Sequence, residues 1–352
     1  MRVNAALNVS VDTSSVSANQ ESPCMDDHEV QPATPRFGAH EAITSRLGLE
    51  RIEGFSLATF FSAVFQSRGA DHVEDHLSVG FRATTPALSP AMAAMPTPWL
   101  FGRCLFLTLL LFVPLYLAFE ASGNPLLLPG LVTLGAFAVP ISTLVLFFEL
   151  NTPRNVSITR VAWLFLMGAV TSLLLSTLLY ENTPLLGVVG APAAGLVEEA
   201  GKLLALALVT RRFDLARYPY MLNGLLFGAA VGAGFAAFET SGYAFVLAGR
   251  EGTIMDILIL RGAMAPFGHI VWSAMIGAAY WRLRVAGLPF TQIVRDRGFL
   301  RLFGAAAVLH AIWNLGLPLP PWVLAGGLGF VGWVIVISLV GTGLREVWRR
   351  AA

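Results

Sequence analysis

Charged side chains are scarce in this sequence. Asp, Glu, Lys and Arg make up only 13% of its 352 residues, whereas hydrophobic residues make up 55% and the mean hydropathy is +0.67. A soluble domain usually has about 25% charged residues. The composition therefore excludes an ordinary soluble domain and predicts a polytopic membrane protein.

Cysteine and lysine are almost absent. The two cysteines, Cys24 and Cys104, fit neither a disulfide framework nor a zinc ribbon. Lys202 is the only lysine, beside 22 arginines. An ammonium group can lose its proton on burial and a guanidinium cannot. A single lysine inside an apolar run therefore indicates a chemical role.

Apolar runs of about 20 residues, the length of a membrane-spanning helix, recur along the chain. They predict an all-α fold, a polytopic membrane helical bundle of about eight transmembrane helices. The runs are residues 99–119, 126–148, 161–180, 184–209, 220–247, 262–281, 299–317 and 322–343. Prolines in the second and fourth predict breaks or tilts there.

The arginines between these runs predict the orientation. The linkers after the second, fourth and sixth runs and the C-terminal segment hold 13 arginines, whereas the other linkers hold 2. Because cytoplasmic loops are enriched in Lys and Arg, we expect both termini to face the cytoplasm, N-in and C-in.

The chain divides by composition. Residues 1–98 are rich in Ser, Thr, Pro and Ala, and we expect a mostly disordered cytoplasmic tail. Within it, the charged run Asp71–His76 resembles a metal cluster in composition but is better explained as a solvated charge run. Residues 99–344 form the transmembrane domain, and residues 345–352 are expected to be a cytoplasmic C-terminal tail.

Ionisable residues deep in the predicted spans each need a reason, because charge is costly inside a bilayer. The fourth span contains Glu198, Glu199 and Lys202, which share about one helix face at i,i+3 and i,i+4 spacing. The next three spans add four polar residues: Glu239, His269, His310 and Asn314. Taken one at a time, these residues could be a structural ion pair, a cap or satisfied buried histidines.

Depth connects these positions. Glu199, Glu239, His269 and His310 each lie about 7 or 8 residues from the outer end of their helix, or roughly 10–12 Å below the outer surface at about 1.5 Å per residue. A single site near the outer face is therefore expected.

Such a set suits hydrolysis. Glu199 is expected to be the general base that activates water. Glu198 is expected to pair with Lys202, because Glu followed by Lys at i,i+4 is the better ion-pair geometry. The two histidines can stabilise an oxyanion, and Asn314 can orient His310 or donate to the same oxygen.

A metal-dependent version is equally compatible with the sequence. Two histidines and a carboxylate, His269, His310 and Glu239, can hold zinc and leave a fourth position for water. These residues come from three helices, and no His-Glu-x-x-His pair fixes two ligands on one helix face. The sequence leaves open whether a divalent metal is a cofactor.

Four elements on successive helices, "EEAGK", "FAAFE", His269 and "HAIWN", together resemble the PrsW family of intramembrane proteases. That family is similar in turn to the C-a-a-X prenyl endopeptidase (CPBP) superfamily. The resemblance covers about residues 184–317 and implies that Glu198, Glu199, His269 and His310 are catalytic. One departure is Thr240, where an asparagine would be expected after Glu239.

The resemblance implies an intramembrane endopeptidase of a bacterial cytoplasmic (inner) membrane. Its substrate would be a membrane-anchored protein, such as an anti-sigma factor, cut near the outer face. Two alternatives remain open at this stage. One is a prenyl endopeptidase or immunity protein of the CPBP type, and the other is a proton-coupled transporter, in which the Glu, Lys and His groups would relay protons.

Overall fold

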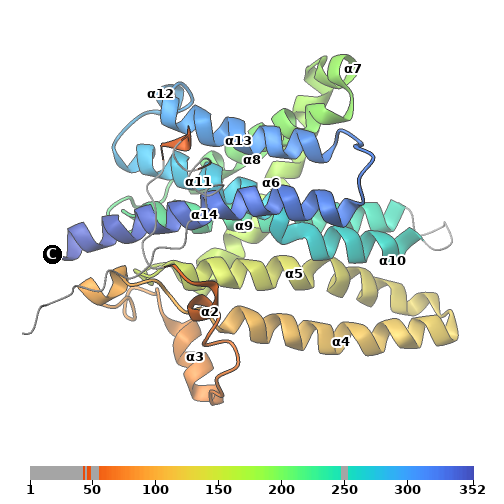
Figure 1. Ribbon diagram of the computed structural model, residues 1–352, viewed down its shortest axis with the longest axis horizontal. Coiled ribbons are helices and arrows are strands. Elements are labelled where there is room, and N and C mark those ends of the chain that lie inside the picture. Colours follow the sequence, from red (N-terminus) through yellow and green to blue (C-terminus); the bar gives the residue numbers. More distant parts are fainter. Residues whose placement is uncertain (1–42, 44–45, 49–54, 247–252) are drawn as a thin grey trace, which may run out of the picture. The chain divides into compact units, whose positions relative to one another are not determined.

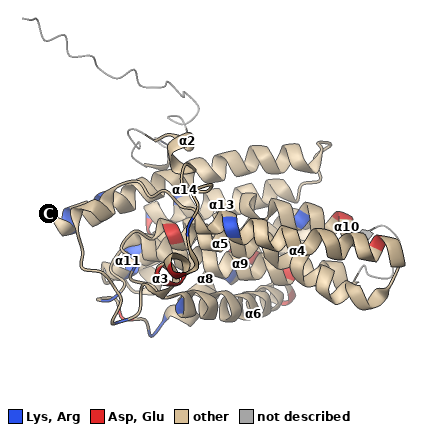
Figure 2. Ribbon diagram, turned by 90° about the horizontal axis from the view of Figure 1, so that it is seen from below, with Lys and Arg blue, Asp and Glu red and all other residues tan. Residues whose placement is uncertain are grey.

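The computed structural model describes residues 43, 46–48, 55–246 and 253–352, all within one compact unit, Phe37–Ala352. These residues form helices and turns without a β-strand among them, which confirms the predicted all-α fold. Most of the ribbon is free of charged residues, as Figure 2 shows.

Five helical segments of the described chain are long and apolar enough to cross a membrane (Figure 1). They contain α4 (Leu100–Ser122), α5 (Leu128–Leu150), α6 (Ile158–Asn182), α9 (Met221–Val246) and α14 (Pro321–Ala351). A sixth candidate is a pair of segments, Ile254–Gly262 and Ala265–Val285, that meet at an angle of 44°. Membrane spans are therefore confirmed in general, with five or six that meet this criterion.

Two shorter helices fall on the remaining predicted spans. They are α8 (Ala194–Thr210) and α13 (Arg297–Trp313), each 17 residues long. Helix α11 (His269–Val285), also 17 residues long, belongs to the bent sixth candidate. Short elements join these helices: α2 (Leu57–Phe60), α3 (Ala70–Ser78), η1 (Pro90–Ala93), η2 (Pro125–Leu127), α7 (Leu185–Val189), η3 (Ala191–Ala193), α10 (Thr253–Ile257), η4 (Leu258–Gly262), η5 (Ala265–Phe267) and α12 (Phe290–Ile293).

Helix breaks occur at one of the two predicted places and at one unpredicted place. The fourth predicted span is interrupted between α7 and α8, where Gly190 has a φ of 70°. The second is not interrupted, because α5 continues through Pro140. The sixth is interrupted at Gly268, just after Pro266, whose ring cannot donate a backbone hydrogen bond. This break makes His269 the first residue of α11.

The described part of the N-terminal region, residues 55–98, contains α2, α3 and η1, where the sequence predicts a mostly disordered tail. The rest of that prediction falls largely outside the described residues. The carboxylate of Glu149 in α5 accepts hydrogen bonds from the backbone N–H groups of Trp99, Leu100 and Phe101 and so caps α4. At the other end of the chain, α14 continues to Ala351, so most of residues 345–352 extend the last helix.

Helix α9 is the centre of the packing and contacts α5, α6, α8, α11 and α14. Its most extensive contact is with α11, through a stripe of glycines. A Cβ added to Gly224, Gly228 or Gly232 would overlap the backbone or Cβ atoms of α11. Small residues every fourth position allow such close approach between membrane helices. The stripe therefore sets the position of α11 and of His269 at its start.

The glycine stripe can be tested by adding one methyl group. Gly228→Ala should destabilise the protein, because the new Cβ would overlap the carbonyl oxygen of Ser273 and overpacking typically costs about 1–3 kcal/mol. The melting temperature of the purified protein should fall. The control is Gly242→Ala in the same helix, where a Cβ would meet nothing within 4 Å. Equal melting temperatures for the two variants would contradict the close-packing interpretation.

His76 makes the attachment of α3 sensitive to acid. Its Nδ1 accepts a hydrogen bond from Arg154, and its Nε2 lies 3.6 Å from Oε1 of Glu149. Burial, together with the charges of Arg154, His72 and Arg68, lowers the pKa of His76 from 6.5 to about 4. The folded state therefore disfavours the protonated ring. The stability that the neutral His76 ring contributes to the folded state is complete above pH 6.5 and is lost as the pH falls towards 4.

Limited proteolysis of residues 66–98 at pH 7 and pH 5 measures this effect. Cleavage should be faster at pH 5, and His76→Gln should remove most of the difference. His72→Gln, which changes an exposed histidine of the same helix, is the control and should retain it. A pH dependence that persists unchanged in His76→Gln would refute the role of this histidine.

Candidate active site

Two close helix contacts position α8. A Cβ added to Gly195 would overlap the backbone of Ala307 in α13, and one added to Gly201 would overlap Ser176 in α6. Helix α8 therefore lies directly against both neighbours. This approach holds its acidic pair and its lysine in the interior, and all three are buried: Glu198, Glu199 and Lys202.

Glu199 is bonded within its own helix and to one further helix, α13. Its Oε1 accepts a hydrogen bond from Nζ of Lys202 at 2.5 Å and from Nδ1 of His310 at 2.9 Å. The side chains of Glu199 and Lys202 are 0% and 1% exposed. The ion pair is therefore removed from solvent, and His310 joins it to α13.

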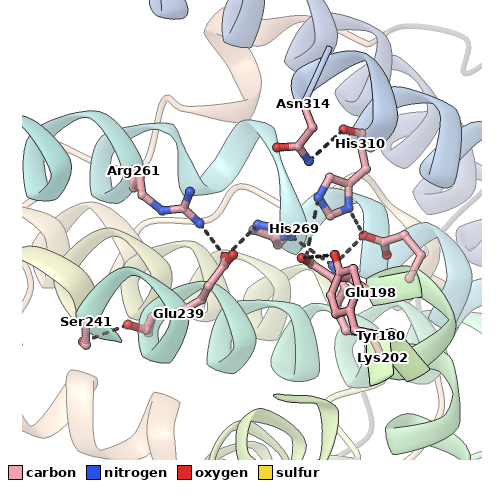
Figure 3. A network of polar contacts seen from close by, with 11 residues as sticks. Tyr180, Glu198, Lys202, Glu239, Ser241, Arg261, His269, His310 and Asn314 are labelled. Carbon is pink, nitrogen blue, oxygen red and sulfur yellow. Dashed lines mark hydrogen bonds and ion pairs between the residues drawn. The ribbon is translucent and has the colours of Figure 1, made fainter. Parts of the chain in front are cut away.

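His269 lies between Lys202 and Glu239 (Figure 3). Its Nδ1 is 3.0 Å from Nζ of Lys202, and its Nε2 is 3.1 Å from Oε2 of Glu239. Because an ammonium group only donates, Nδ1 must accept from Lys202, which leaves the ring proton on Nε2 facing Glu239. Arg261 also donates to Oε2 of Glu239, at 2.5 Å.

Glu198 has the fewest partners of the three glutamates. Its Oε1 accepts a hydrogen bond from the hydroxyl of Tyr180 at 3.1 Å. Its Oε2 is buried without a hydrogen-bond partner and lies 3.6 Å from Nε2 of His310. Because Nδ1 of His310 donates to Glu199, Nε2 carries a lone pair directed away from that bond.

Aromatic rings enclose the cluster. The ring of Phe235 lies under the ammonium of Lys202, with its centroid 4.6 Å from Nζ, and 5.1 Å from the ring centroid of His269. Trp272 stacks on His310 with centroids 4.6 Å apart. These contacts restrict both imidazole rings.

The structure brings six of the seven predicted residues into one network of side-chain contacts: Glu198, Glu199, Lys202, Glu239, His269 and His310. Asn314 lies next to it but not in it. Its Nδ2 donates to the backbone carbonyl of His310 at 3.4 Å and does not reach the ring. Asn314 ends α13 at its C-cap position.

The predicted pairing within α8 is wrong. Lys202 bonds to Glu199 at i,i+3 and not to Glu198 at i,i+4. The group of described residues that could hold a metal differs from the predicted set. Glu239 is held by Arg261, whereas a ligand atom from each of Glu198, His269 and His310 lies within 4.8 Å of the others. Glu198 thus takes the place of Glu239 beside the two histidines in that group.

Sequence reasoning missed Tyr180 and Arg261. Tyr180 ends a predicted span, where tyrosine usually marks the membrane interface. Arg261 lies one residue before the predicted span 262–281, and it belongs to η4, a π-helical turn that directs it to Glu239. π-Helical turns often occur at functional sites, but the sequence carries no clear signal for them.

Carboxylates and imidazoles buried together in an all-helical membrane protein are typical of a membrane-embedded hydrolase, because such groups activate water and stabilise an oxyanion. A comparison with family models makes the assignment specific. The model of the PrsW family intramembrane metalloprotease matches residues 152–341, more than half of the 352-residue chain. The chain belongs to the PrsW family and is a peptidase, as the sequence elements predicted. No curated protein and no solved structure matches it.

The buried ion pair can be tested by removing one member and then both. Lys202→Met should lower the free energy of unfolding by about 3–5 kcal/mol, the usual cost of leaving a buried charge without its partner. The double variant Lys202→Met/Glu199→Gln should recover most of that loss, because no charge is then stranded. Thermal unfolding of the purified variants measures both changes. Additive losses in the double variant would show that the two charges do not depend on each other.

Proposed function

We propose that this peptidase cleaves a membrane-anchored protein at the cluster of Glu198, His269 and His310. The observation that carries the proposal is their arrangement. One ligand atom from each lies within 4.8 Å of the others, and Oε2 of Glu198 is buried without a partner. One carboxylate and two imidazoles are the donor set of many catalytic zinc sites.

These three residues fit a divalent metal ion, which is also what the family description implies. When bound, such an ion lowers the pKa of a coordinated water and so supplies a nucleophile near neutral pH. Each histidine already donates one ring N–H to a glutamate, His310 to Glu199 and His269 to Glu239. Outer carboxylates of this kind orient metal-binding histidines. Because Nδ1 of His269 accepts from Lys202, a ligand role for that atom requires Lys202 to release it.

Glu198 and Glu199 have different roles in this proposal, and the roles are the reverse of those expected from spacing. Glu199 uses Oε1 for both Lys202 and His310 and holds the site together. Oε2 of each of these two glutamates is buried without a partner, but Glu198 is the one with a ligand atom within 4.8 Å of both histidines, so its Oε2 is assigned to contact the attacking water or the ion that binds it. Tyr180 fixes the other oxygen of Glu198, and Arg261 fixes Glu239, so both act as positioning residues.

The proposed topology has eight spans with both termini in the cytoplasm and the site nearer the outer face. The 17-residue helices α8 and α13 support this count, since at about 1.5 Å per residue each is roughly 25 Å long, close to the ~30 Å hydrocarbon core. The domains are the N-terminal region 1–98, the protease domain 99–344 and the segment 345–352. By resemblance, the membrane is a bacterial inner membrane and the substrate is similar to an anti-sigma factor.

Co-expression with single-span candidate substrates tests the proposal. Glu198→Gln should reduce the cleavage rate at least about 100-fold, the scale of losing a group that activates water, and should leave the melting temperature near that of wild type. Glu199→Gln is the matched comparison. It should lower the melting temperature as well, because it strands the Lys202 charge. Cleavage by Glu198→Gln at the normal rate would refute the assignment.

The metal content of the purified protein distinguishes a metal-dependent mechanism from a metal-free one. The purified wild type should hold about one divalent ion, and Glu198→Gln should lose it. Glu239→Gln should bind the ion roughly 10–100-fold more weakly, as expected for an outer partner. Full activity after treatment with a strong chelator would exclude the metal and leave Glu198 as the base. If Glu239→Gln lost the ion as completely as Glu198→Gln, the originally predicted ligand set would be restored.

A further inference from the structure

A cavity of about 590 Å³ lies where α6 begins and α8 ends. Two residues of α8 line it, Leu208 and Val209. Leu208 is ten residues from Glu198, which corresponds to roughly 15 Å along the helix at about 1.5 Å per residue. Neither His269 nor His310 lines this cavity. It is therefore separate from the site described above.

Positive charge dominates one end of this cavity. Five arginines line it, and Asp214 is the one acidic residue among the described lining residues. Oδ1 of Asp214 already accepts a hydrogen bond from the backbone of Ala216 at 3.0 Å. The arginines come from three segments that converge here: Arg82, Arg160, Arg211, Arg212 and Arg217.

In the described part of the chain, these five guanidinium groups have no ion-paired carboxylate. Arg217 donates to the backbone carbonyl of Gly80, and Arg160 lies over the ring of Phe213 at 4.8 Å. Uncompensated guanidinium groups that converge on one cavity indicate an anionic ligand.

The other end of the cavity is apolar. Trp163 and Met167 of α6 are 40% and 42% exposed, and Leu208 of α8 is 45% exposed. Trp163, Met167 and Thr171 follow one another at i,i+4 spacing and lead from the arginines towards the middle of α6. The cavity thus combines a cationic end with an apolar path along two membrane helices.

We propose that this cavity binds an anionic membrane phospholipid, with the phosphate at the arginines and one acyl chain along α6 and α8. Guanidinium groups bind phosphate oxygens through two parallel hydrogen bonds. Basic pockets between membrane helices are suited to anionic lipid head groups. A free phosphate would use the arginines but would leave the apolar path without a role, which is why we assign a lipid.

Native mass spectrometry of the purified full-length protein in detergent tests this assignment. Phosphatidylglycerol is titrated against wild type, with phosphatidylcholine and water-soluble glycerol phosphate as the comparison ligands. We expect one tightly retained phosphatidylglycerol. Arg160→Gln/Arg212→Gln should weaken its binding by at least about tenfold, because charge-assisted hydrogen bonds to the phosphate are lost. The single variant Arg212→Gln changes an exposed side chain, so a weaker effect in the same direction cannot be ascribed to misfolding.

The control variant Arg282→Gln/Arg295→Gln removes the same charge from exposed arginines outside the cavity and should bind the lipid normally. Trp163→Gln should weaken phosphatidylglycerol but not glycerol phosphate, because only the lipid contacts the apolar path. Equal weakening in the cavity and control variants would overturn the proposal in favour of general surface charge. Glycerol phosphate bound as tightly as the lipid would overturn it in favour of a phosphate site. Lipid binding is measured without proteolysis, so a negative result for the lipid does not contradict the proposed catalytic site.

Discussion

The buried ion pair between Glu199 and Lys202 is the interaction on which the rest of the site depends. Two opposite charges removed from water are tolerated only when each is well partnered. Lys202 meets this condition through Glu199 and His269, and Glu199 through Lys202 and His310. The pair therefore joins α8 to α11 and α13 through the two histidines. His269 completes the contacts of Lys202, and His310 completes those of Oε1 of Glu199.

The fold and the residues of the site could be predicted because both leave conspicuous features in the sequence. Apolar runs of span length identified every long helix, and ionisable residues inside those runs identified six residues that meet in one network. In an apolar environment an unexplained charge is costly. Glu239, His269 and His310 were therefore conspicuous even without a neighbouring motif.

The pairing inside the site could not be predicted because it depends on rotations that the sequence does not encode locally. Glu198 and Glu199 are both within reach of Lys202 along the helix, at i,i+4 and i,i+3, and peptide preferences favour the former. The close contacts at Gly195 and Gly201 instead turn α8 so that Glu199 faces inward. The π-helical turn at Arg261 carries no clear sequence signal, whereas the break at Gly268 has a local cause in Pro266. Without them His269 and Arg261 could not meet at Glu239.

Counting the charges of the described cluster supports the proposal that Glu198 is the reactive member. Glu199 is compensated by Lys202 and Glu239 by Arg261, but no cationic side chain forms an ion pair with Glu198 other than His310, and then only if that ring is protonated. Tyr180 provides one neutral hydrogen bond, and the second oxygen of Glu198 has no partner. A buried carboxylate in this condition is unfavourable unless it binds a proton, a metal ion or a polar substrate group. Oε2 of Glu199 also lacks a partner, but the other oxygen of that carboxylate is paired with Lys202. A deviation of this kind at Glu198, beside both histidines, is expected where a protein binds its reactants.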